Sequence, residues 1–149
     1  LKKYPNFDYL ITLDGDGEHK INEIKFFIKA LKSKPDLIIG NRNRKNRILE
    51  SLLSFLFKLR FNIFDPMSGY KAYSKKIITH YRRFKNNFFL VDIIMSNSEK
   101  KIMNIDITSP KRIGLSKQGP VIPINIKILK ILMLTLFRLK KIVVYKSKN

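Results

Sequence analysis

The chain of 149 residues contains no cysteine and no tryptophan, and it has few acidic residues. Without cysteine there is no disulfide and no thiolate metal site, and the redox compartment is left open. Aspartate and glutamate number 11 against 31 lysines and arginines, which gives a net charge of +20. This balance favours polyanionic partners such as phosphorylated substrates, an anionic membrane surface or nucleic acid.

Long apolar runs and a signal pattern are also missing. The longest apolar run, Ile131 to Phe137, is far shorter than the ~20 residues that a membrane-spanning helix needs. The chain opens on Leu1 within ordinary sequence and without a leader pattern, so we expect a piece of a longer protein. A hydrophobic content of 44% predicts a globular domain with its own core.

The few carboxylates are concentrated after the first apolar run. Phe7 to Leu13 predicts a buried strand, and Asp14, Asp16 and Glu18 follow it at alternate positions. The intervening glycines permit a tight turn at the C-terminal end of the strand, where open α/β sheets bind ligands. Hard oxygen ligands of this kind suit Mg²⁺ or Mn²⁺. A solvated turn is the commoner interpretation of an isolated motif this short, and an EF-hand would need further oxygen ligands.

Helical and strand patterns alternate after this turn. Asp36 to Gly40 predicts a second strand, and a helix precedes it in which Glu23 and three lysines lie opposite the expected core face of Ile21, Ile24, Ile28 and Leu31. Strand, helix and strand within some thirty residues form a βαβ unit, so we expect the two strands to be parallel. The basic loop 41–47 should then lie at the same edge of the sheet as the acidic turn.

The remaining elements are predicted from periodicity and turn residues. We expect helices at 48–61, 75–84 and 88–100, a turn at 65–70, strands at 71–74 and 102–108, and a basic loop at 109–119. From Ile124 to Tyr145 the chain predicts a helix whose basic residues share an arc of about 80°, namely Lys127, Lys130, Arg138 and Lys141. We expect this helix to lie on a membrane surface without crossing it. The alternatives are packing on the domain's own core or against a helix outside this chain.

Four segments together carry a family resemblance. Tyr9 to His19 is similar to a strand that ends in a D-x-D motif, and Ile38 to Arg42 is similar to I-x-G-S-R. Asp65 to Tyr70 resembles D-P-M-S-G-F, and Gly114 to Lys117 resembles G-x-S-K. These motifs, in this order, are typical of family-2 glycosyltransferases of the GT-A fold, and most similar to the dolichyl-phosphate mannosyltransferase and polyprenyl-phosphate branch. The resemblance covers about residues 7 to 118.

The resemblance implies an α/β fold and an enzyme. Residues 1–119 would be the C-terminal part of a GT-A (Rossmann-like) glycosyltransferase domain without its N-terminal nucleotide-binding half. Residues 120–149 would form a basic amphipathic helical segment at the membrane surface. The implied reaction moves a sugar from a nucleotide-diphosphate sugar to a lipid-linked acceptor, a polyprenyl phosphate, with Mg²⁺ or Mn²⁺. The implied location is peripheral, on the cytoplasmic face of a membrane.

Residue roles follow from the matched motifs. The resemblance implies metal and sugar-diphosphate contacts for Asp14 and Asp16, with Glu18 as a third metal ligand. Arg42 and Arg47 correspond to basic residues that meet phosphate groups and are candidate catalytic residues.

The acceptor side has its own set of implied residues. Asp65, Ser68 and Gly69 lie in the segment that shapes the acceptor side, and a basic loop contacts phosphate or acceptor through Arg112, Ser116 and Lys117. The family's arginine before G-x-S-K has no clean counterpart, since the chain offers Lys111 and Arg112 there.

Acid–base chemistry depends on the nature of the acceptor. A phosphate acceptor is already an anionic nucleophile, and Asp65 or Asp92 could act as a base if the acceptor were a hydroxyl. For Asp92 a structural role is the favoured interpretation. His19 and His80 are assigned no catalytic role, because each lacks an evident partner in the sequence.

Two other function classes remain. A basic nucleic-acid-binding module agrees with the net charge, but aromatic residues cluster in apolar runs and no nucleic-acid motif is present, so we expect no nucleic-acid partner. The chain could also be a truncated, inactive glycosyltransferase fragment.

Overall fold

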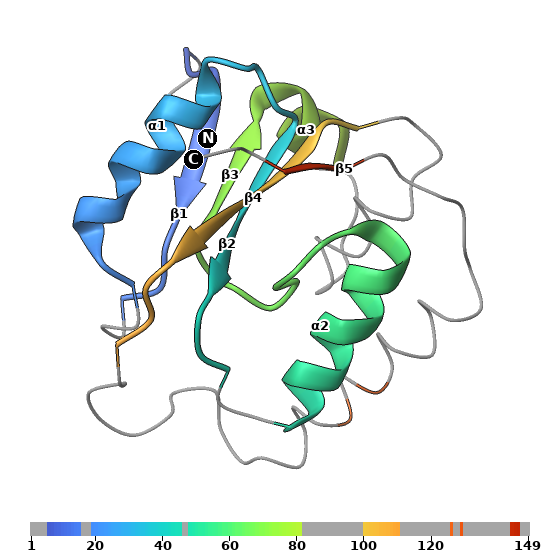
Figure 1. The fold of residues 1–149 in the computed structure, drawn as a ribbon. Helices are drawn as coiled ribbons and strands as arrows, with labels where there is room; N and C mark the ends of the chain where they lie inside the picture. The colour runs from blue at the N-terminus through green and yellow to red at the C-terminus, as the bar shows by residue number, and fades with distance from the viewer. Residues whose placement is uncertain are drawn as a thin grey trace.

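The computed structural model describes residues 6–15, 19–45, 48–81, 100–110, 126, 129 and 144–146. Its strands are β1 (Tyr9–Thr12), β2 (Leu37–Arg42), β3 (Lys71–Ser74), β4 (Ile102–Ile107) and β5 (Val144–Lys146). Its helices are the short 3₁₀ helix η1 (Ile21–Glu23) and the α-helices α1 (Ile24–Leu31), α2 (Ile48–Phe61) and α3 (Lys75–Tyr81), as Figure 1 shows.

The strands form one mixed sheet in the order β1-β3-β2-β4-β5. Strand β3 is antiparallel to both of its neighbours, whereas β2, β4 and β5 are parallel to one another. The predicted α/β class is therefore confirmed. Strands β1 and β2 run in the same direction as predicted, but they are not adjacent, because β3 lies between them (Figure 1).

The antiparallel course of β3 decides what meets at one edge of the sheet. The residues before β3 lie at the edge where β1, β2 and β4 end, because β3 runs opposite to those strands. Backbone hydrogen bonds join the segments at this edge: the Gly40 amide donates to the Tyr70 carbonyl at 2.8 Å, and the Asn43 amide donates to the Ile107 carbonyl at 3.3 Å. Segments from three parts of the sequence thus come together there.

Helix α1 covers one face of the sheet with an apolar face that differs from the predicted one. Phe27 and Ala30 are buried in a core cluster with residues of β2, β3 and β4, including Ile38, Ala72 and Ile105. Ile24 and Leu31 pack against this cluster, but Ile21 and Ile28 are 70% and 55% exposed, so their predicted core positions are wrong. Glu23, predicted on the exposed side, is buried instead, because the Phe27 ring and not the Ile21–Ile28 row faces the sheet.

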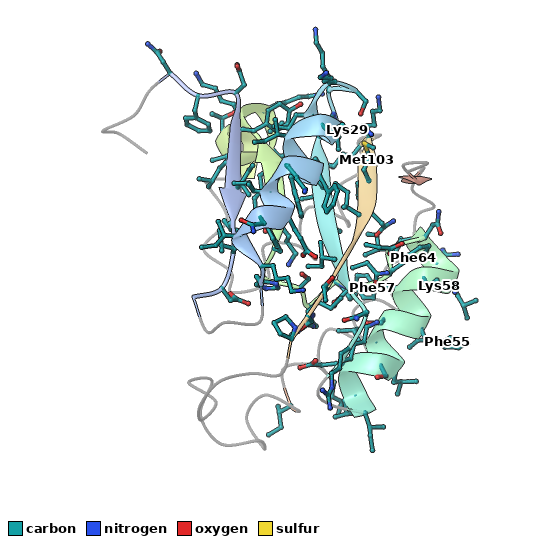
Figure 2. All side chains as sticks on the ribbon, turned by 60° about the vertical axis from the view of Figure 1, so that its left-hand side comes forward. Lys29, Phe55, Phe57, Lys58, Phe64 and Met103 are labelled. Atoms are coloured by element: carbon teal, nitrogen blue, oxygen red, sulfur yellow. The ribbon has the colours of Figure 1, made fainter. Side chains whose placement is uncertain are left out.

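Helix α2 has the bounds predicted for it, Ile48–Phe61. Its buried residues are Glu50, Leu53, Ser54, Phe57 and Phe61, so a carboxylate and a hydroxyl turn inward beside the apolar side chains. Figure 2 shows Phe57 directed toward the sheet and Phe55 directed away from it, in agreement with exposed fractions of 1% and 56%.

The C-terminal region departs from the prediction of one helix through Tyr145. Val144–Lys146 form β5, which pairs in parallel with β4 from Ile102 to Asn104. β-Branched and aromatic residues favour an extended strand where a neighbouring strand is available. Ile126 and Leu129 are helical and about half exposed. The predicted helix at 88–100, apart from its last residue, and all four residues of the basic arc lie outside the described residues.

Within the described part of the chain, no helix has both the length and the apolar character needed to cross a membrane.

Candidate functional site

Asp14 and Gly69 are in direct contact at the edge where β1 ends and β3 begins. A Cβ atom added to Gly69 would overlap the Asp14 carboxylate, so any other residue at position 69 would force this side chain to move. The Thr12 hydroxyl donates a hydrogen bond of 3.0 Å to the Gly69 carbonyl and fixes the two segments together. Two of the resemblance-bearing segments therefore share one small volume.

The Asp14 carboxylate is half exposed and lies in a positive environment. His19 Nε2 is 3.4 Å from Asp14 Oδ2, and the His19 side chain is fully buried. The polar contact from His19 lowers the pKa of Asp14; burial opposes the shift, and the charges of His19, Lys71 and Arg42 add to it. Asp14 is accordingly an anion at neutral pH, with a carboxylate that solvent and ligands can reach.

The His19 ring packs against core side chains, away from solvent. It packs edge-to-face on Tyr70 with centroids 5.3 Å apart, and Tyr70 stacks on Phe27 at 4.3 Å. The sequence shows no evident partner for His19, whereas in the structure its Nε2 lies 3.4 Å from Asp14 Oδ2. That His19 has no catalytic role stays a prediction. No local pattern in the sequence reveals this contact.

Arg42 and Asp65 form a buried ion pair next to this contact. Arg42 Nε donates to Asp65 Oδ2 at 2.7 Å, its second guanidinium nitrogen donates to Oδ1 at 3.2 Å, and its backbone amide approaches Oδ2 at 3.3 Å. Glu50 Oε2, from α2, lies 3.6 Å from the same guanidinium. Asp65 is fully buried and Arg42 is 7% exposed. The pair therefore joins the end of β2 to the segment that leads into β3.

These contacts give Arg42 and Asp65 a structural role in the edge of the sheet. The guanidinium fork is occupied by two carboxylates, and Asp65 accepts its hydrogen bonds away from solvent. Ser68 is also buried, and its hydroxyl accepts a hydrogen bond of 3.2 Å from the Tyr70 amide, which shapes the turn before β3. The catalytic role of Arg42 and Asp65 and the substrate contact of Ser68 remain predictions.

Lys71 is a charged residue of this site that the sequence analysis did not identify. Its ammonium group donates to the Pro66 carbonyl at 3.1 Å, and the side chain is buried. Burial lowers the pKa of Lys71 from 10.5 to about 8, against the opposing charges of Asp65 and Asp14. Lysines are seldom buried. The position of Lys71 at the start of a strand within a buried sheet is the sequence feature that could have pointed to its burial.

The residues of the edge fit part of a divalent-cation site. Asp14 offers a hard, ionised and accessible oxygen donor, as Mg²⁺ and Mn²⁺ require. Among the described residues, no group of three or more histidine, aspartate or glutamate side chains could enclose a metal. The other two predicted ligands, Asp16 and Glu18, lie outside the described residues, and so do Arg47, Arg112, Ser116 and Lys117.

Comparison of the chain with protein-family models finds no match, and comparison with curated proteins finds none either. The site therefore has to be interpreted from its own chemistry: an accessible carboxylate, a buried histidine against it and two buried cations nearby.

Proposed function

We propose that this chain is the C-terminal part of a GT-A glycosyltransferase that transfers a sugar from a nucleotide-diphosphate sugar to a polyprenyl phosphate. The observation that carries the proposal is the contact between the Asp14 carboxylate and Gly69. It joins the D-x-D-like turn to the D-P-M-S-G-F-like segment, whose linked residues Thr12 and Gly69 are 57 positions apart. Two segments that share a ligand site must lie at the same edge of an α/β sheet.

The proposed chemistry rests on charge neutralisation. A divalent cation held by Asp14, with Asp16 and Glu18, would neutralise the diphosphate that leaves from the donor sugar. His19 Nε2 lies 3.4 Å from one oxygen of Asp14, and the carboxylate is half exposed. The positive charges of Lys71 and Arg42 favour the anionic state of Asp14.

The burial of Asp65 also agrees with a phosphate acceptor. A lipid phosphate attacks as an anion and needs no general base, whereas a hydroxyl acceptor would need one. Asp65 is buried in its pair with Arg42, with no solvent-exposed surface to offer a hydroxyl. In this proposal Arg42 and Asp65 act as positioning residues that hold the segment before β3 against Asp14.

Metal-dependent nucleotide binding tests the proposal directly. Titration calorimetry with UDP or GDP, on the protein that includes the N-terminal nucleotide-binding half, should show binding in Mn²⁺ and little binding in excess chelator. Asp14→Asn should weaken that binding by about 100-fold, the scale on which loss of metal-site residues acts. Asp8→Asn is the matched control, because Asp8 is an exposed aspartate that precedes β1 at the opposite edge. A nucleotide affinity that is unchanged both in excess chelator and in the Asp14→Asn variant would refute the metal role.

Transfer of a labelled sugar to polyprenyl phosphate tests the reaction itself. Asp16→Ala should reduce turnover by about 100-fold, as expected for removal of an electrostatic stabiliser of the leaving group. Full turnover in that variant contradicts the mechanism. Metal-dependent nucleotide binding without transfer from any donor would instead support the alternative of an inactive fragment.

A further inference from the structure

Helix α2 is apolar on two opposite faces. At about 100° per residue, its buried residues Leu53, Phe57 and Phe61 point to one side. On the other side lies a row that we name the α2 stripe, whose members fall within an arc of about 60°: Ile48, Leu52, Phe55 and Leu59. These side chains are 89%, 46%, 56% and 69% exposed. A surface helix ordinarily carries polar residues on the face away from the core, so this row needs a partner.

The charged residues that flank the α2 stripe are cationic. Lys58 and Arg60 lie on either side of it and are exposed, and Lys45 stands before the helix. Among the described residues, no carboxylate forms an ion pair with any of these three. The acidic residue of α2, Glu50, is buried against Arg42 and contributes no charge to the outer surface.

A cationic pocket of about 300 Å³ adjoins the stripe. It is lined by Lys45 and Lys58, by the polar side chains of Asn41, Ser51 and Ser54, and by the rings of Phe55 and Phe64. The Ser54 hydroxyl is buried and has no hydrogen-bond partner among the described residues. The Lys58 ammonium lies 5.5 Å from the centre of the Phe64 ring. Two ammonium groups and a free hydroxyl are donors that suit a phosphate group.

We propose that the outer face of α2 docks on an anionic lipid surface, with the α2 stripe in the apolar boundary and Lys45 and Lys58 on headgroup phosphates. An amphipathic helix with a basic polar face and large apolar residues binds in this way. The biological meaning of this contact rests on the proposed function. The membrane contact is assigned to α2, and it would bring a lipid-linked acceptor to the edge of the sheet that holds Asp14.

Charge decides against a second copy of the chain as the occupant. A twofold contact through α2 would bring Lys58 and Arg60 of two molecules, each with a net charge of +20, close together. Like charges across an interface disfavour association, whereas lysines beside an apolar stripe can extend their ammonium groups to the headgroups.

A single tryptophan placed in the stripe tests the contact. The chain contains no tryptophan, so Phe55→Trp introduces the sole indole reporter. Its emission should shift to the blue on vesicles of phosphatidylcholine with phosphatidylglycerol, and brominated lipid should quench it. Ile28→Trp is the matched control, because Ile28 of α1 is 55% exposed against 56% for Phe55, and its emission should stay unchanged. If the emission of Phe55→Trp does not change when vesicles are added, the proposal is overturned, even if the chain sediments with the vesicles.

Loss-of-binding variants separate the apolar and charged contributions. Phe55→Ser with Leu59→Ser should reduce vesicle partitioning by about tenfold or more, since each removes a large apolar side chain from the boundary. Lys45→Gln with Lys58→Gln should reduce partitioning to anionic vesicles and abolish its dependence on salt. Both residue pairs lie on the surface, and circular dichroism checks that the variants are folded. Unchanged vesicle partitioning of the Ser variant refutes docking through α2. A blue shift of the Phe55→Trp variant that rises with protein concentration in the absence of lipid would indicate self-association and refutes it as well.

The vesicle measurements use no sugar donor, so they fail or succeed independently of the transfer reaction. Docking through α2 without any transfer activity would leave the membrane surface supported and the proposed function refuted.

Discussion

At the scale of single residues, the site depends on how closely two backbones approach. Asp14 occupies the space that a side chain at position 69 would fill, and the Thr12 hydroxyl holds the Gly69 carbonyl beside it. Gly40 is similarly restricted, since a Cβ there would lie 2.8 Å from a methyl of Ile107 and 3.0 Å from the Tyr70 carbonyl. Both glycines are needed for close packing at the same edge of the sheet.

Gly69→Ala should therefore displace the Asp14 carboxylate. We expect it to destabilise the fold by about 1–3 kcal/mol, as overpacking in a close contact does, and to weaken Mn²⁺-dependent nucleotide binding. Gly15→Ala is the control, because no atom lies within 4 Å of a Cβ at that position. Urea unfolding and calorimetry report the two effects. Equal stability and nucleotide affinity of both variants would contradict the observed contact.

The buried Lys71 should make stability depend on pH in the alkaline range. Its pKa is about 8 in the folded chain and 10.5 when exposed, so the unfolded chain binds more protons between these values. The free energy of unfolding should consequently rise from pH 8 to 10.5, by up to about 3 kcal/mol from this group alone. Urea unfolding at intervals of pH measures the slope.

Comparison with variants isolates the contribution of Lys71. Lys71→Met should lose this rise, while Lys29→Met, at an exposed lysine of α1, should retain it. A slope shared by wild type and Lys71→Met would mean that other groups titrate in this window and that Lys71 is accessible to water.

At the scale of elements, α1 and α2 both carry more apolar surface than one buried face requires. The predicted core face of α1 included Ile21 and Ile28, yet the sheet is in contact with Phe27 and Ala30. Periodicity identifies an amphipathic helix, but several apolar arcs overlap in a helix this rich in isoleucine and phenylalanine. The stacking of Phe27 on Tyr70 selects one of them.

Neighbouring residues of α1 provide a test of this orientation. Phe27→Ala should destabilise the chain by about 3–5 kcal/mol, because it leaves a cavity against Tyr70. Ile28→Ala should change stability by less than about 0.5 kcal/mol, because its side chain is more than half exposed. Urea unfolding of both variants measures the difference, and a larger effect at Ile28 would favour the helix rotation predicted from sequence.

At the scale of the whole molecule, the net charge of +20 opposes compaction. Raising sodium chloride from ~0.01 M to ~0.15 M shortens the screening length from about 30 Å to about 8 Å, which weakens repulsion between dispersed lysines. We expect the urea midpoint to rise over this range.

A charge-reduced variant provides the control for this salt effect. Lys25→Gln with Lys29→Gln removes two exposed charges of α1 and should respond less to salt than wild type. A midpoint that falls with salt would mean that attractive pairs, such as Lys76 with Asp36 at 3.8 Å, outweigh the repulsion.

Periodicity and turn residues are local properties, and they were enough to predict the α/β class, the bounds of α2 and the presence of the first strands. Of the candidate site, the acidic turn after β1 and the segment before β3 could be identified from their motifs. Their contact depends on the antiparallel course of β3 between β1 and β2, which no local pattern encodes.

Only the tertiary structure decided which partners the charged residues have. Arg42 meets Asp65 and Glu50, His19 meets Asp14, and Lys71 is buried between strands. Each contact joins segments whose approach is set by strand order and by helix rotation, and both of these follow from packing the whole core. Spacing along the chain reports which residues are apolar or charged, whereas burial and pairing depend on what the fold brings against them.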